Sequence, residues 1–196
     1  TGCPSAVHDQ KFEAWTPRAG VQFDVTRSIM AYATYQKGFK AGGVGAGTCG
    51  NDYDPETIEG GEAGVKMELA DRRIRLNLAG YWYKYGNLQV QKTLGTAGGF
   101  TVLNAADSKI KGIEASLSAR IVEGLQFDAA AMVQSAKYTD FINCDQTVFL
   151  GACGATDPRP ADDPTRFAQV AGNWLNRAPP YSISTGLEYT MPIGDN

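Results

Sequence analysis

The dominant pattern along this chain is a strict alternation of apolar and polar residues. In the clearest run, Ile74, Leu76, Leu78, Gly80 and Trp82 fall at every second position. Successive side chains of a β-strand point to opposite faces, so these five residues would share one face. The opposite face would carry the residues between and after them, Arg75, Asn77, Ala79, Tyr81 and Tyr83. The run therefore predicts a strand with one apolar face and one mainly polar face.

Similar runs recur along the whole chain and predict seven strands. They span residues 14–25, 29–40, 57–69, 73–91, 102–120, 125–141 and 181–191. Short turns follow the first, third and fifth strands, whereas much longer loops follow the second, fourth and sixth. Outer-membrane barrels show this asymmetry of turns and loops. We therefore expect an all-β fold, an antiparallel meander of about seven long strands that is a section of a large transmembrane β-barrel, with one partial barrel domain over residues 1–196.

Aromatic residues gather where the predicted strands meet the long loops, and fewer lie near the short turns. The first group comprises Trp15, Tyr35, Phe39, Tyr83, Tyr85, Tyr138, Phe141 and Tyr181. The second comprises Phe23, Phe127 and Tyr189. Transmembrane barrels carry a girdle of aromatic side chains at each membrane interface. The two groups therefore predict the two girdles.

A lipid-facing sheet must also close on itself. An unpaired backbone group costs several kcal/mol in hydrocarbon, so an open edge does not face lipid. Bacterial barrels normally have an even number of strands, and seven strands are therefore interpreted as part of a larger barrel. The strands exceed the length of about 9–11 residues that spans a bilayer, so they are expected to project beyond it.

Composition excludes several other classes. The net charge of -3 offers no basic surface for nucleic acid. No apolar run approaches the length of about 18 residues that a membrane helix needs. Four cysteines, an even number, lie in predicted loops and favour disulfides in an oxidising compartment. Cys144 with Cys153 would close a short loop and Cys3 with Cys49 would join two loops, although the sequence does not fix this connectivity.

Three apparent motifs do not support a cofactor, metal or catalytic site. Residues 45–50 fit G-x-G-x-x-G, but turn-forming residues follow where a dinucleotide site needs a helix. Two acidic clusters lack the spacing of a calcium loop, namely Asn51, Asp52 and Asp54, and Asp157, Asp162 and Asp163. The single histidine, His8, has no nucleophile elbow or carboxylate partner in the sequence. No cofactor, no metal and no enzymatic activity are expected.

Polar residues on the second face would line the lumen of the barrel. We expect them to pair with one another or with a plug, because buried charges need partners. They are Arg18, Gln22, Lys66, Arg75, Asn77, Glu114 and Gln134. Ligand contact is expected instead in the outer loops, where aromatic and cationic side chains offer stacking and anion binding. The candidates are Tyr53, Arg159, Arg166 and Trp174.

Several short motifs, in order along nearly the whole chain, resemble TonB-dependent outer-membrane receptors. They include Tyr-Gln-Lys-Gly-Phe-Lys-Ala-Gly-Gly at 35–43, Tyr-Asp-Pro-Glu-Thr at 53–57 and Glu-Ala-Gly-Val-Lys at 62–66. Leu-Asn-Leu-Ala at 76–79 with Tyr85 and Gln89, and Asn-Ala-Ala at 104–106, continue the match. So do Gly-x-Glu at 112–114, Tyr-Thr-Asp-Phe at 138–141 and Asn-Arg-Ala-Pro at 176–179. Gly61 and Pro180 depart from the pattern, which often has an aromatic and a basic residue there.

This resemblance implies a barrel of about 22 strands with a plug inside it. Members import scarce ligands such as iron–siderophores, cobalamin or glycans, driven through TonB by an inner-membrane energy complex. The resemblance implies that this segment lies in the bacterial outer membrane, among its lipids, with the long loops extracellular. No plug and no TonB-contacting segment are recognised among these residues.

Two other functions fit the same alternation. A passive porin or adhesin barrel would lack the plug and the segment that contacts TonB. A secreted all-β binding domain would fold as a sandwich, whose core also produces alternating strands. Detergent-dependent solubility would separate the barrels from the sandwich, and the presence of a plug would separate an importer from a porin.

Overall fold

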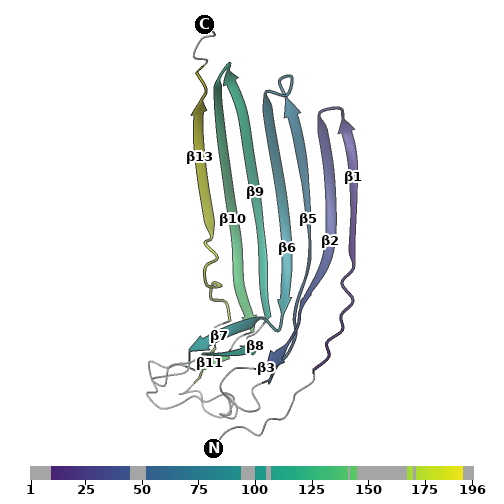
Figure 1. Cartoon of the computed structure of the whole chain (residues 1–196), viewed down its shortest axis with the longest axis vertical. Helices are drawn as coiled ribbons and strands as arrows, with labels where there is room; N and C mark the ends of the chain where they lie inside the picture. Colours follow the sequence, from purple (N-terminus) through teal and green to yellow (C-terminus); the bar gives the residue numbers. More distant parts are fainter. Residues whose placement is uncertain are drawn as a thin grey trace, which may run out of the picture.

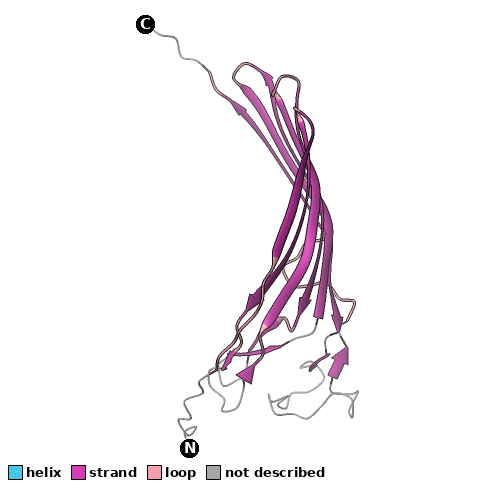
Figure 2. Ribbon diagram, turned by 90° about the vertical axis from the view of Figure 1, so that its right-hand side faces the viewer, coloured by secondary structure: helices cyan, strands magenta, loops and turns pink. Residues whose placement is uncertain are grey.

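The computed structural model describes residues 10–44, 52–93, 100–104, 107–140, 142–144, 167–169 and 171–191. Within these ranges the protein forms one seven-stranded sheet and three two-stranded hairpins. Figure 1 shows the long strands side by side, and Figure 2 shows that the sheet is strongly twisted and curved. Within the same ranges, no helix is long and apolar enough to cross a membrane.

The large sheet is an antiparallel meander in which each strand pairs with the long strand before it. Its order is β1 (Arg18–Thr26), β2 (Ile29–Lys40), β5 (Glu56–Leu69), β6 (Ile74–Gly86), β9 (Asp107–Val122), β10 (Leu125–Asp140) and β13 (Tyr181–Tyr189). This order confirms the predicted fold class. The outermost strands β1 and β13 are the two edges of the sheet and do not pair with each other.

The small hairpins all lie at one end of the sheet. They are β3 (Gly43–Val44) with β4 (Asp52–Tyr53), β7 (Gln89–Thr93) with β8 (Phe100–Asn104), and β11 (Ile142–Cys144) with β12 (Phe167–Gln169). They occupy the segments that connect β2 to β5, β6 to β9 and β10 to β13 (Figure 1). We call this the loop end of the sheet. The tight turns after β1, β5 and β9 lie at the opposite, turn end.

Three predicted strands are clearly shorter in the structure than expected. The run at 73–91 ends as a sheet strand at Gly86, because Asn87 adopts a left-handed conformation with φ of 54° and turns the chain into β7. The run at 102–120 is interrupted after Asn104, so that β9 begins at Asp107. The first strand begins at Arg18 rather than at residue 14. Alternation continues through the bend after Gly86, with Leu88 and Val90 at every second position, so the pattern did not reveal that bend.

The register of the sheet gathers the apolar residues on one face. A single cross-strand row passes from Ala33 through Ala63, Gly80 and Ile113 to Val133. Ile113 is 67% exposed and Val133 is 66% exposed. A water-soluble sandwich would bury such side chains under a second layer. Here nothing in the described chain covers them, as expected for a face that meets lipid.

The same register corrects the expected girdle at the loop end. Tyr35 lies on the apolar face, as predicted for a girdle position. Trp82, which was not assigned to the girdle, shares its cross-strand row through Gly61. Tyr83, Tyr85 and Tyr138 lie on the opposite face, so their assignment to the girdle was wrong. Adjacent residues of a strand point to opposite faces, and closeness to the strand end does not alter this. Tyr181 takes the girdle position on β13.

The second group of aromatic residues does share the apolar face near the turn end. Phe23 pairs with Ala31, and Phe127 pairs with Ala119 and Leu187. Phe23 is 70% exposed and Tyr189 is 59% exposed. These positions suit the other membrane interface, where aromatic rings are favoured.

Two adjacent alanines of β10 test the assignment of the faces. Ala131 lies in the apolar row with Ala115 and Ile183, whereas Ala130 lies on the other face beside Ser116 and Ser184. Ala131→Arg is expected to destabilise the complete barrel by about 2–4 kcal/mol, since it places a cation in hydrocarbon. Ala130→Arg, the matched control, is expected to have a much smaller effect. Urea unfolding in lipid vesicles measures both, and equal losses would contradict the assignment.

Candidate functional site

The face opposite the apolar one carries the polar residues that were predicted to line the lumen. The register rows place Gln22 beside Tyr32, Lys66 beside Asn77, and Gln134 beside Gly112. Arg18, Arg75 and Glu114 point to the same face of the sheet from β1, β6 and β9. All seven predicted residues therefore share one face, which we call the inward face.

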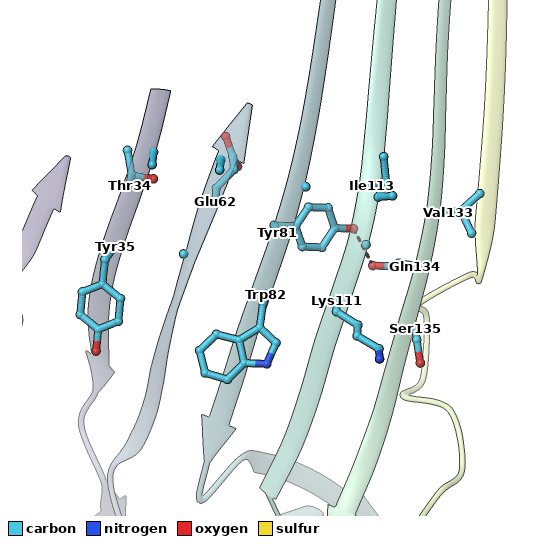
Figure 3. A pocket seen from close by; sticks show the side chains of 15 residues that line it. Thr34, Tyr35, Glu62, Tyr81, Trp82, Lys111, Ile113, Val133, Gln134 and Ser135 are labelled. Carbon is cyan, nitrogen blue, oxygen red and sulfur yellow. Dashed lines mark hydrogen bonds between the residues drawn. The ribbon is translucent and has the colours of Figure 1, made fainter. Parts of the chain in front are cut away.

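Polar side chains on the inward face pair with one another, as expected. Asn77 donates from Nδ2 to Ser116 Oγ at 3.0 Å. Tyr81 donates from its hydroxyl to Gln134 Oε1 at 3.1 Å (Figure 3). Arg75 Nε lies 3.5 Å from Glu68 Oε1. The strands are thus linked across their polar side as well as through their backbones.

Inward-facing tyrosines cover glycines on neighbouring strands. A Cβ at Gly112 would lie 2.6 Å from the Tyr81 hydroxyl, and a Cβ at Gly64 would lie 2.8 Å from Tyr32 Cε1. Larger residues at these glycines would displace the rings. Tyr32 in turn donates a hydrogen bond to Glu62. The tyrosines therefore hold fixed orientations against the wall.

An open depression of about 430 Å³ lies on the inward face toward its middle. Lys66, Asn77, Glu114 and Ser116 line it together with small residues of β10 and β13. The Lys66 ammonium lies 5.4 Å from the centre of the Tyr32 ring, a cation–π distance. The depression therefore presents one cation and one carboxylate to the lumen.

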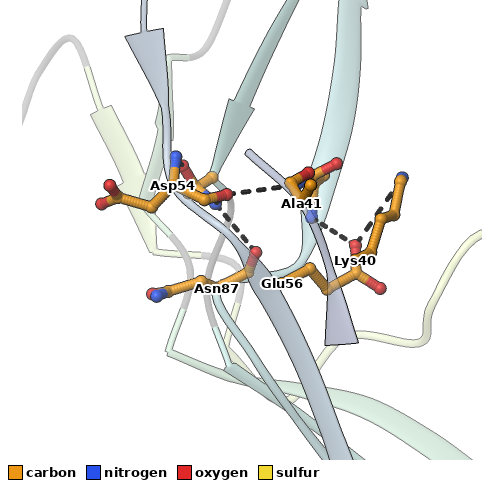
Figure 4. Close-up of polar contacts among 7 residues, drawn as sticks. Lys40, Ala41, Asp54, Glu56 and Asn87 are labelled. Atoms are coloured by element: carbon orange, nitrogen blue, oxygen red, sulfur yellow. Dashed lines mark hydrogen bonds and ion pairs between the residues drawn. The ribbon is translucent and has the colours of Figure 1, made fainter. Parts of the chain in front are cut away.

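Gln89 links three segments at the loop end. Its backbone N–H donates to Glu56 Oε2 at 2.9 Å, and its side-chain amide donates to the carbonyls of Ala41 at 2.9 Å and Asp54 at 3.1 Å. Lys40 Nζ lies 4.0 Å from the same Glu56 oxygen (Figure 4). Gln89 thus joins the end of β2, the start of β5 and the start of β7.

Asn104 completes this network from the end of β8. Its Oδ1 accepts from the Asp54 N–H at 2.6 Å, and its Nδ2 donates to the carbonyls of Asp54 and Asn87, each at 2.9 Å. The side-chain amide thereby bonds backbone groups of Asp54 and Asn87, which lie outside the hydrogen-bonded ladder of the sheet. Because Asp54 directly follows Tyr53, the network fixes the backbone beside a predicted ligand residue.

The predicted ligand-binding residues do not all come together. Tyr53 is half-buried in β4, where its backbone pairs with Gly43. Trp174 forms an isolated bridge with Lys137, whose ammonium lies 5.2 Å from the centre of its ring. Lys137 points to the apolar, outer face of β10. Because its ammonium lies over the Trp174 ring, Trp174 lies at the outer side of the wall. Arg159 and Arg166 lie outside the described residues, and the roles of all four in ligand binding stay predictions.

Most of the residues considered for disulfides or for calcium binding also lie outside the described ranges. Cys3, Cys49 and Cys153 are not among the described residues, and only the backbone of Cys144 is described, in β11 opposite Phe167. The acidic positions Asp157, Asp162 and Asp163 likewise fall outside. Among the described residues, no group of three or more His, Cys, Asp or Glu side chains could hold a metal ion.

A two-faced meander with small hairpins at one end defines a segment of a membrane-spanning β-barrel wall. The family described as "TonB dependent receptor-like, beta-barrel" matches residues 1–195. The chain therefore belongs to the β-barrel family of TonB-dependent receptors.

Individual relatives agree with this assignment. The metal-pseudopaline receptor CntO of Pseudomonas aeruginosa is 27% identical over 169 residues, which cover 86% of this chain and 23% of that protein. The ferric-pyoverdine 358 receptor of Pseudomonas putida is 31% identical over 112 residues, covering 56% of this chain and 14% of that protein. The chain thus spans less than a quarter of the length of these curated relatives.

Solved structures show the same fold. The ferric yersiniabactin uptake receptor FyuA of Yersinia pestis superposes with a TM-score of 0.64 at 17% identity, over 89% of this chain and 22% of that one. The ferric-catecholate import receptor Fiu of E. coli gives a TM-score of 0.51 at 18% identity, over 66% of this chain and 19% of that one. This likeness concerns the arrangement of the strands in the barrel wall.

Sequence reasoning missed the loop-end network. Gln89 and Asn104 stood within motifs that resemble the family, but neither residue was assigned a role from the sequence. A side-chain amide that bonds backbone groups 35 or 50 residues away leaves no local periodic signal. The available signal was an amide residue near each end of the predicted loop between residues 91 and 102, where backbone groups lose their ladder partners.

Replacing Asn104 by Ala tests whether the network anchors the Tyr53 segment. The change removes three hydrogen bonds and leaves the Asp54 N–H and carbonyl without these partners. We expect amide exchange at residues 53–55 to accelerate by roughly tenfold or more, since each lost bond contributes about 0.5–1.5 kcal/mol. Hydrogen-exchange mass spectrometry of the complete receptor measures this.

Gln91→Ala provides the matched control, since Gln91 is an exposed residue of the same hairpin outside this network. It should leave exchange at 53–55 unchanged. Equal exchange in wild type and Asn104→Ala would refute the anchoring role.

Proposed function

We propose that this segment forms part of the wall of an outer-membrane importer for metal chelates of the siderophore class. The observation that carries the proposal is the division of the sheet into an apolar face without cover and a polar face with internal pairing. Lipid would cover the first face, and a plug and an aqueous passage would meet the second. The edges β1 and β13 would pair with further strands to close the barrel.

The names of the relatives favour metal chelates over cobalamin and glycans as the ligand. One relative is named for metal-pseudopaline and another for ferric-pyoverdine. Both names describe a ligand that contains a metal. Aromatic and cationic loop residues suit such ligands through stacking and anion binding.

Energy for transport would come through TonB and the inner-membrane complex, acting on a plug inside the barrel. In this scheme the protein catalyses no reaction. The ligand binds at the loop end, which we place on the extracellular side because outer-membrane barrels have short turns toward the periplasm and longer loops outside. Anchoring of Tyr53 by the neighbouring Asp54 contacts would hold one binding side chain at the entrance.

Tyr53→Ala tests the ligand role of this residue. Loss of the ring is expected to raise the dissociation constant for a bound ferric siderophore by roughly five- to thirtyfold, the range of about 1–2 kcal/mol for a stacked or cation-contacting aromatic ring. Tyr53→Phe keeps the ring and is the matched control. Fluorescence quenching of the purified complete receptor, titrated with ferric pyoverdine and ferric yersiniabactin, measures the affinity. Equal affinity of Tyr53→Ala and wild type would remove Tyr53 from the site.

Uptake and topology test the function as a whole. Radioactive iron supplied as either chelate should enter cells that carry the complete receptor, and uptake should disappear in a strain without TonB. An epitope inserted at residues 95–98 should be labelled on intact cells, whereas one at Glu123 should be labelled only after the outer membrane is opened. Uptake that persists without TonB would instead identify a passive porin.

A further inference from the structure

A row of lysines borders the apolar face at its loop end. The register places Lys37 beside Glu59, Glu59 beside Lys84, Lys84 beside Lys109, and Lys109 beside Lys137. All five side chains point to the same face of the sheet as the apolar rows. One line across five strands therefore carries four cations and a single carboxylate, on a protein whose net charge is -3.

This row has an excess of positive charge that the described protein does not neutralise. Lys84 and Lys109 are directly opposed cross-strand neighbours, and like charges in such positions are destabilising. Lys111 adds a fifth cation one position nearer the apolar band, between Trp82 and Ser135. Within the described ranges, Lys37, Lys84, Lys109 and Lys111 form no ion pair. An anion from outside the sheet would relieve the repulsion.

Next to these lysines the apolar face is hollowed. Gly61, Ala63 and Gly80 provide little side-chain bulk, and the register places Gly61 between Tyr35 and Trp82. Figure 3 shows the rings of these two aromatic residues beside the depression. The depression measures about 910 Å³, and most of its lining residues belong to the outward face. Tyr35 is 46% exposed and Trp82 is 45% exposed, so the rings project from the wall.

We propose that this surface binds an anionic phospholipid, one whose phosphate charge is not neutralised by its own headgroup, with the phosphate held by Lys84, Lys109 and Lys111 and an acyl chain lying in the depression between Tyr35 and Trp82. The lysines begin where the lipid-facing apolar rows end, so a lipid that lies against these rows would bring its headgroup to the lysines. Charge complementarity selects a phosphate, and a lysine near an anionic membrane surface contributes about 1 kcal/mol, or roughly fivefold in affinity. The long lysine stems can lie along the apolar wall while the ammonium reaches the headgroup.

The proposal goes beyond ligand import and depends only on the membrane-spanning sheet. The test uses the complete receptor in lipid nanodiscs with spin-labelled phosphatidylglycerol or spin-labelled phosphatidylcholine as probes. Electron paramagnetic resonance gives the fraction of each lipid that is immobilised by the protein. Wild type is expected to prefer phosphatidylglycerol several-fold, and the preference should weaken at high salt because it is electrostatic.

Lys84→Gln combined with Lys111→Gln should remove most or all of this several-fold preference, because two of the cations that hold the phosphate are lost. Lys66→Gln combined with Arg75→Gln is the matched control, since it removes two cations from the inward face of neighbouring strands. A preference that survives in the first variant, or an equal loss in the control, would overturn the proposal. Retention of the heat-modifiable barrel band on gels shows that each variant is folded.

The acyl-chain part has its own test at Gly80. A Cβ built there would lie 3.9 Å from its nearest neighbour, Gly112 O, so the backbone has room for a side chain, and Gly80→Leu adds bulk to the depression. We expect this variant to immobilise severalfold less phosphatidylglycerol while keeping all its lysines. Millimolar inorganic phosphate should not displace the lipid from wild type. Full displacement by phosphate, or unchanged immobilisation in Gly80→Leu, would show that the depression holds no chain.

Discussion

The continuous backbone ladder that joins the seven long strands fixes the environment of every side chain in the sheet. Side chains alternate between faces with a period of two, so one register decides at once which residues meet lipid and which meet the lumen. A shift of one residue in any strand would move its apolar set to the polar face. In hydrocarbon the ladder must also be complete, because an unpaired N–H or C=O group has no water to bind.

The loop end shows what happens where this ladder stops. The chain leaves the large sheet after Gly86 and rejoins it at Asp107, and the backbone groups of Asp54, Ala41 and Asn87 need other partners. Side-chain amides of Gln89 and Asn104 supply them. Rigid hydrogen bonding in the wall and side-chain bonding at its rim are therefore the same physical requirement, met in two ways. The side-chain hydrogen bonds to Asp54 hold the backbone next to Tyr53 in place.

The outer face combines three features that lie next to one another in the register. Apolar rows end at Tyr35 and Trp82, small residues hollow the wall beside these rings, and lysines follow on the adjoining positions. Trp174 joins the same outer side through the Lys137 ammonium. The features suit the layers of a membrane, with hydrocarbon against the apolar rows, the interface at the rings and phosphate at the lysines.

The alternation by itself determined the fold class, the seven strands, their antiparallel order and the inward position of residues such as Lys66, Asn77 and Gln134. These follow from local periodicity, which a single strand displays in its own sequence. The loop-side girdle could have been predicted better, because parity alone places Trp82 outward and Tyr83 inward.

Only the tertiary structure decided how separate strands align. Cross-strand register brought Lys37, Lys84 and Lys109 into one row, although 47 and 25 positions separate them along the chain. It also placed Asn104 against Asp54 and Trp174 against Lys137. Periodicity records which face a residue occupies, but it carries no information about the height at which neighbouring strands pair. That height is set by the lengths and bends of the connections, which leave no regular pattern in the sequence.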